Sequence, residues 1–150
     1  MSTGVENAVS RFANGHSCSQ SVLGAYCERL GLDEATAMKI GCAFSGGMGR
    51  MGLTCGVVTG AIAVIGLRYA AGDPLNKDAK EHTLARVREF AEQFKARNHG
   101  HLDCRDLLGC DLSTPEGQAE AKEKGLHKTI CTQLVRDAAE ILERLGVADR

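Results

Sequence analysis

Apolar residues recur at helical spacing along almost the whole chain, and no stretch of useful length alternates between apolar and polar residues as a strand does. The most apolar segment, Cys55 to Ala71, carries few polar residues on any side, so we predict that it forms a buried central helix. A long amphipathic helix is expected over about 78–97, with its apolar stripe at Leu84, Val87, Phe90, Ala91 and Phe94. The sequence therefore predicts an all-α fold, a single compact helical domain over residues 1–150.

Cap and turn residues divide this pattern into separate helices. We expect Ser17 to cap a helix that runs to about Leu30, Gly31 to end it, and Asp33 to begin the next helix. The segment 46–52 holds too many glycines for a regular element and is predicted to be a structured loop. A final amphipathic helix is expected over about 129–145.

Small residues recur along the central helix at near-turn spacing, at Gly56, Gly60 and Ala61. They allow another backbone to approach closely. We expect this approach to take place within the monomer, and a homodimer seam is the alternative.

Composition and charge narrow the classes of partner. The chain has 18 basic and 19 acidic residues and lacks Trp, which argues against nucleic acid and against an anionic membrane surface. The longest apolar run, 53–67, is shorter than the ~20 residues that span a bilayer. The N-terminal residues show no secretory signal, so a cytoplasmic location is the expectation. Glutathione and thioredoxin keep thiols reduced there, which disfavours a static disulfide framework for seven cysteines.

Three of the seven cysteines follow a residue that favours a helix N-cap: Cys18 follows Ser17, Cys55 follows Thr54, and Cys104 follows Asp103. A cysteine in a first helical turn lies at the positive end of the helix dipole, which favours its thiolate. Thiolates bind metals and attack disulfides. The pattern therefore indicates redox or metal chemistry.

The order of these elements resembles the C_GCAxxG_C_C family of redox-active proteins. The matching segments are Ser17 to Leu23, Gly46 to Gly52, Cys55 to Gly60, Cys104 to Gly109, and Cys131 ahead of the last helix. The resemblance covers about Ala8 to Leu145, with one departure at Val57, where the pattern has Ala. It implies a redox-active protein without an assigned reaction, and similar domains occur in some haem- and iron–sulfur-containing cytochromes.

The resemblance further implies that Cys18, Cys55, Cys104 and Cys131 are the functional quartet. Four thiolates is the number that a tetrahedral zinc ion or an iron–sulfur cluster requires. Helix N-termini and the backbone N–H groups of the glycine-rich loop would stabilise their negative charge. We therefore add as supporting residues Gly47, Gly49, Arg50 and Gly56. Arg50 would offset excess negative charge.

Three functions remain open at this point. The leading hypothesis is electron transfer or redox sensing through an iron–sulfur cluster, with the two-iron type favoured and an unidentified redox partner protein. The first alternative is a metal-free thiol–disulfide oxidoreductase, with Cys55 or Cys18 as the attacking thiolate. The second is structural zinc. The chain has no C-x-x-C pair, the usual signature of thioredoxin-type dithiols and of two-knuckle zinc ribbons.

For the remaining cysteines and the histidines, the main expectation is a place in the core, at the surface or in a turn. Cys27 shares a helical face with Leu23 and is expected to be an inert core thiol. Cys42 is assigned to packing, with a fifth thiol beside the site as its alternative, and Cys110 is expected to be a surface or half-buried thiol that is close enough to act as a resolving thiol. His127 lies four residues before Cys131, a spacing that suits one metal ion, but we expect it to face solvent. His99 and His101 are expected to form a polar turn, with tuning of the Cys104 pKa or metal binding as the alternative, and His82 is expected to be solvated. His16 precedes Cys18 by two residues, and a role as a base for Cys18 is its alternative.

Overall fold

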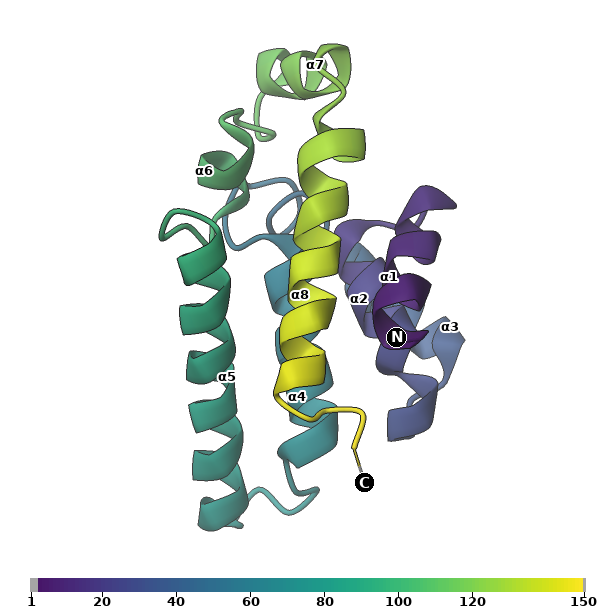
Figure 1. Ribbon diagram of the computed structural model, residues 1–150, viewed down its shortest axis with the longest axis vertical. Helices are drawn as coiled ribbons and strands as arrows, with labels where there is room; N and C mark the ends of the chain where they lie inside the picture. The colour runs from purple at the N-terminus through teal and green to yellow at the C-terminus, as the bar shows by residue number, and fades with distance from the viewer. Residues whose placement is uncertain (1–2, 150) are drawn as a thin grey trace.

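The computed structural model describes residues 3–149 and confirms the all-α prediction (Figure 1). The α-helices of this range are α1 (Thr3–Ala13), α2 (Cys18–Tyr26), α3 (Glu34–Ala43), α4 (Gly56–Tyr69), α5 (Lys77–Arg97), α6 (Cys104–Leu108), α7 (Pro115–Glu123) and α8 (Thr132–Arg144). Two short turns complete them, the 3₁₀ turn η1 (Glu28–Leu30) and the π-helical turn η2 (His127–Cys131). An isolated bridge pairs Thr54 with Asp103.

The apolar helix α4 lies at the centre, as predicted. It packs against α2, α5 and α8, and α1 covers α2 and α8 from the outside (Figure 1). The largest fully buried side chains come from these helices: Tyr26, Phe90, Phe94, Leu23, Ile65, Ile141 and Leu142. A second, smaller core cluster lies among α6, α7 and η2, and its buried residues are Cys104, Leu108, Cys110, Leu112, Ala121 and Cys131.

The predicted caps stand where the sequence places them. Ser17 forms a capping box with Gln20, whose backbone N–H donates to the Ser17 hydroxyl while the Gln20 side chain accepts from the Ser17 N–H. Asp33 caps α3 by accepting from the Thr36 N–H at 2.9 Å. Gly31 ends the first segment at a φ of 92°. One cap differs: Cys55, not Thr54, is the N-cap of α4.

Two further details of the helices depart from the prediction. Leu84 is 40% exposed, so the buried stripe of α5 is carried by Phe90 and Phe94, together with Thr83. The N-terminal helix α1 was not predicted. It is marked by few apolar residues, of which Val5 and Ala8 are buried.

The small residues of α4 face inward, as expected. A Cβ on Gly60 would lie 2.9 Å from the Ser19 carbonyl oxygen of α2, and one on Gly56 would lie 3.1 Å from the Ser19 nitrogen. The close approach therefore joins α2 to α4 within the chain, and the homodimer stays a prediction. No helix within residues 3–149 is long and apolar enough to cross a membrane.

Candidate functional site

The four cysteines of the predicted quartet line one cavity. The cavity has a volume of about 40 Å³ and is lined by Cys18, Cys55, Cys104 and Cys131, together with glycines, leucines and His127. Each thiol comes from a different element: Cys18 begins α2, Cys55 caps α4, Cys104 begins α6, and Cys131 ends η2. Residues up to 113 positions apart in the sequence thus line the same cavity, which their spacing alone does not predict.

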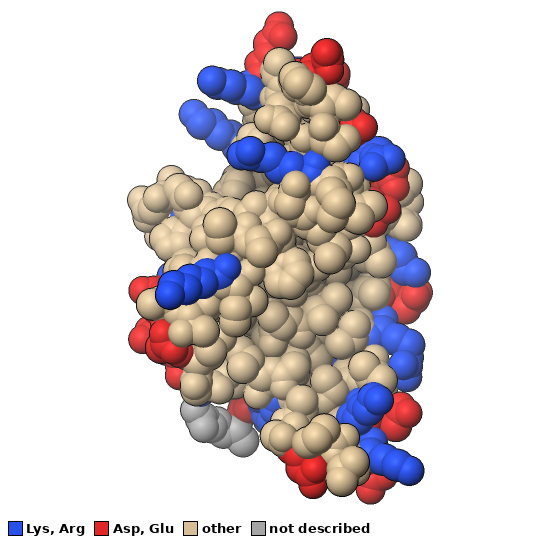
Figure 2. Space-filling model, turned by 180° about the vertical axis from the view of Figure 1, so that it is seen from behind, with Lys and Arg blue, Asp and Glu red and all other residues tan. Residues whose placement is uncertain are grey.

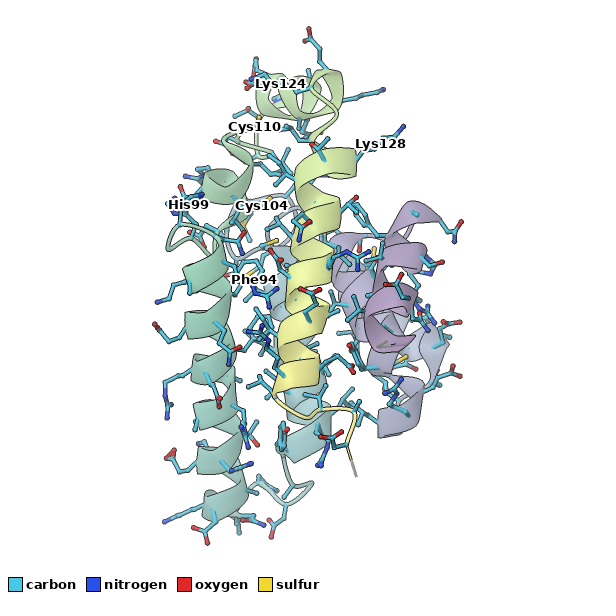
Figure 3. All side chains as sticks on the ribbon, viewed as in Figure 1. Phe94, His99, Cys104, Cys110, Lys124 and Lys128 are labelled. Atoms are coloured by element: carbon cyan, nitrogen blue, oxygen red, sulfur yellow. The ribbon has the colours of Figure 1, made fainter. Side chains whose placement is uncertain are left out.

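A short backbone ladder brings Cys55 and Cys104 together. The Cys55 N–H donates to the Leu102 carbonyl at 2.8 Å, and the Cys104 N–H donates to the Leu53 carbonyl at 2.6 Å. The Leu53 N–H in turn donates to the Gly47 carbonyl at 3.0 Å. The glycine-rich loop therefore fixes the segments that carry both cysteines. In Figure 3, Cys104 lies between α6 and α8, whereas Cys110 lies beside α7.

Gly47 and Gly56 are required by close contacts beside the cysteines. A Cβ on Gly47 would lie 2.8 Å from the Cys104 Cβ and 2.7 Å from the Leu53 carbonyl oxygen, and the φ of Gly47 is 75°. A Cβ on Gly56 would lie 3.2 Å from the Cys18 Cβ. Both glycines, which the sequence suggests as supporting residues of the cysteine site, line the cavity.

Gly49 and Arg50 lie apart from the cavity. A Cβ on Gly49 would meet no atom within 4 Å, and Arg50 lines a neighbouring groove. The Arg50 side chain packs over Gly46, which separates the groove from the cavity and lines both. Arg50 therefore lines the groove and not the cavity.

Burial opposes the thiolates that the helix N-termini were expected to favour. It raises the pKa of Cys55 to about 12, although the backbone N–H groups of Val57 and Val58 near this sulfur favour the thiolate. Burial also raises the pKa of Cys104 to about 12, and the negative charges of Cys131 and Asp103 add to the effect. In the metal-free chain, burial therefore outweighs the helix N-terminus at Cys55 and also raises the pKa of Cys104.

Cys18 and Cys131 form a coupled pair. The Cys18 thiol hydrogen-bonds to the Cys131 sulfur, which holds the pKa of Cys131 below its ordinary value and raises that of Cys18. The π-helical turn places His127 beside the pair, with its Nδ1 3.6 Å from the Cys131 Sγ. This imidazole also lowers the pKa of Cys131. Cys18 is half-buried, whereas the other three thiols are buried.

His127 differs from its prediction. Its side chain is exposed, as expected, yet it contacts Cys131 and lines the cavity. The i, i+4 spacing was the available signal, and a π turn changes which residues share a helix face. Two other histidines lie in exposed turns, His99 at a φ of 56° and His101 with its Nδ1 4.0 Å from Asp106.

The three cysteines outside the quartet have distinct environments. Cys27 is fully buried in the main core, as predicted. Cys42 is exposed on α3 and lines neither the cavity nor the core, so its packing role is wrong. Cys110 is 4% exposed and hydrogen-bonds to Glu120, so the prediction of a surface or half-buried thiol is wrong. The helix α7 buries Cys110 through contacts that are not local in sequence.

All seven cysteines have free thiols. Within residues 3–149, no three side chains of His, Cys, Asp or Glu converge closely enough to hold one metal ion. The quartet therefore surrounds a space instead of a single point.

Comparison with known proteins gives one match. Searches of curated proteins and of solved structures found no match to this chain. The model of a family described as "Putative redox-active protein (C_GCAxxG_C_C)" matches residues 16–145. This range includes the four cysteines, the glycine-rich loop and the helices that carry them, so the chain belongs to the C_GCAxxG_C_C family of redox-active proteins.

Proposed function

We propose that the cavity of four cysteines is the redox centre of this protein and that it holds an iron–sulfur cluster of the two-iron type. The observation that carries the proposal is the convergence of Cys18, Cys55, Cys104 and Cys131 from four elements on one cavity. Electron transfer or redox sensing, with an unidentified redox partner protein, is the function that such a centre would serve.

The donor set fits this group. Four cysteine thiolates are the ligands of a two-iron cluster, with two thiolates on each iron. Cys18, Cys55, Cys104 and Cys131 would hold it, and the interaction of Cys18 with Cys131 and the backbone ladder between the segments of Cys55 and Cys104 keep these residues at the cavity. Each iron of such a cluster takes only two of its ligands from the protein and the other two from inorganic sulfide, whereas structural zinc takes all four ligands from the protein. The separation of the thiols therefore favours the cluster over structural zinc.

The surroundings also suit a cluster. Four leucines line the cavity, Leu107, Leu108, Leu112 and Leu134, and they exclude water from the sulfurs. The backbone N–H groups of Val57 and Val58, at the start of α4, lie near the Cys55 sulfur and would stabilise negative charge on it. When bound, the cluster would supply one-electron chemistry. The protein would hold it, set its potential and keep solvent away.

A second candidate is thiol–disulfide exchange, which the contact between Cys18 and Cys131 favours. The Cys131 thiolate would attack a substrate disulfide, and one substrate thiolate would leave and take up a proton. Cys18 would then attack the mixed disulfide, which forms the Cys18–Cys131 disulfide and releases the second substrate thiol. The protein loses two electrons and the substrate gains them. The lowered pKa makes Cys131 the nucleophile in this scheme, in place of Cys55 or Cys18.

One experiment separates these candidates. The full chain is purified without oxygen, its visible spectrum is recorded, and iron, zinc and acid-labile sulfide are counted per chain. The cluster predicts a coloured protein with iron and sulfide in equal amounts. A colourless protein without metal that reduces a model disulfide would replace the cluster with dithiol exchange, and zinc without colour would refute both.

We also propose a cytoplasmic location, where reduced thiols persist.

A further inference from the structure

A groove opens beside the cavity on the side of Cys18. It has a volume of about 530 Å³, within the range of sites that take small molecules. The glycine-rich loop, the start of α2 and the helix α7 contribute to its walls. It shares Cys18, Gly46, Leu112 and His127 with the cavity, so a molecule in the groove would contact the one half-buried thiol of the quartet.

The groove is positively charged although the chain as a whole has a net charge of −1. Arg50 and Lys122 line it, and none of the described residues in its walls carries a carboxylate. Neither cation is among the ion pairs within residues 3–149. Figure 2 shows Lys and Arg side chains gathered across the upper part of the rear face, near the end formed by α7.

The backbone of Arg50 adopts a conformation that is unfavourable for residues other than glycine. Its φ is 65°, in the left-handed region that glycine favours, within a loop where glycine occupies most such positions. Its N–H donates to the Ser45 carbonyl at 2.9 Å, which holds this conformation. Gly46 makes room for the side chain, because a Cβ there would lie 2.5 Å from the Arg50 Cγ. The loop therefore presents an arginine to the groove at a place where a glycine would fit with less strain.

Two imidazoles and an apolar wall complete the groove. His16 lies in its wall, and the Nδ1 of His16 is 3.1 Å from the Arg11 carbonyl oxygen. Because a carbonyl only accepts, this nitrogen carries the proton. His127 lies in the wall shared with the cavity. Phe12 and Leu112 supply apolar surface. The lining thus combines fixed positive charge with an apolar contact.

We propose that this groove binds a small organic anion with two or more negative charges, such as a polycarboxylate or a phosphate ester, and holds it against Cys18. Arg50 and Lys122 supply the charge, and the apolar wall takes the carbon skeleton. The groove is a site in addition to the redox centre, and the ligand class assigned to it is that of the small molecule that reaches that centre. It does not depend on whether the quartet holds a cluster or acts as a dithiol.

The test measures binding of two probes, citrate and phenyl phosphate, to the full chain by calorimetry at low ionic strength. At least one probe is expected to bind, and the Arg50→Gln, Lys122→Gln double variant is expected to bind it about tenfold more weakly. Lys77→Gln is the matched control, because this lysine begins α5 and does not line the groove. Its affinity is expected to equal that of the unchanged chain. Nitrogen-15 spectra of the backbone locate the probe, with shifts expected at Ser17 and Ser45.

Several results would overturn the proposal. These are no binding of either probe at millimolar concentration, equal binding by the double variant and the control, or shifts confined to residues outside the groove. Circular dichroism of each variant shows whether it is folded. Iron content and colour are measured on the same samples. If the protein holds iron but binds no anion, the groove proposal is refuted and the proposal of a redox centre stands.

Discussion

Replacing Gly47 with Ala tests how the loop holds the cysteine site. The added Cβ would lie 2.7 Å from the Leu53 carbonyl oxygen, 2.8 Å from the Leu53 nitrogen and 2.8 Å from the Cys104 Cβ. Two of these atoms belong to the backbone and the third is fixed to it. None of them can move without displacing the ladder that carries Cys104.

The cost has two parts. An alanine at a φ of 75° loses about 1–2 kcal/mol relative to glycine, and forcing a methyl group into a packed site costs about 1–3 kcal/mol more. We therefore expect Gly47→Ala to lower the free energy of unfolding by about 2–5 kcal/mol. Part of this cost would appear as a displaced Cys104 and a weakened redox centre.

Gly49→Ala is the matched control. Gly49 has a φ of 66°, and a Cβ there would meet no atom within 4 Å, so only the backbone cost of about 1–2 kcal/mol applies. Urea unfolding followed by circular dichroism gives both free energies. The reasoning is refuted if the two variants lose the same stability, because the contacts at Gly47 would then carry no energy.

Three further predictions concern the interacting thiols Cys18 and Cys131 and the core. His127→Ala is expected to raise the pKa of Cys131 toward its ordinary value, because the imidazole favours the thiolate. The ultraviolet absorbance of the thiolate, recorded against pH in the metal-free chain, measures this pKa. An unchanged titration would contradict the contact between His127 and Cys131. Because Cys18 donates to the same sulfur, Cys18→Ala should raise that pKa further. Tyr26→Phe removes a hydrogen bond to Glu143 of 2.8 Å and should cost about 1 kcal/mol in urea unfolding, whereas full stability would show that the bond contributes nothing.

Much of the fold follows from local sequence signals. Ser17 and Asp33 bear side chains that accept from the first turn of a helix, and Gly31 and Gly146 adopt the left-handed conformation that ends one. The apolar run of α4 is long enough to mark the central helix. These features depend on residues close in sequence, which is why they are predictable.

The parts that were missed have no signal in the local pattern of residues. Cys110 is buried by α7, and no pattern around it predicts that cover. The π turn that brings His127 to Cys131 shifts backbone hydrogen bonds by one residue without a signature in the apolar spacing. The pKa values of Cys55 and Cys104 reflect burial, which outweighs the helix N-terminus that the sequence displays.

The same limit applies to the quartet. The family resemblance selects Cys18, Cys55, Cys104 and Cys131, and cap residues mark three of them, but spacing does not show that they share one cavity. The structure supplies that convergence. It also separates Arg50, which faces the groove, from Gly47, which lines the cavity.

The central claim is that four cysteines act as one redox centre, and a panel of single Cys→Ser variants tests it most directly. Iron, acid-labile sulfide and visible absorbance are measured per folded chain after purification without oxygen. Variants at Cys18, Cys55, Cys104 and Cys131 should each lose the cluster, whereas Cys42→Ser, at an exposed position, should keep it in full. Equal retention of iron and colour across all five variants would contradict the account.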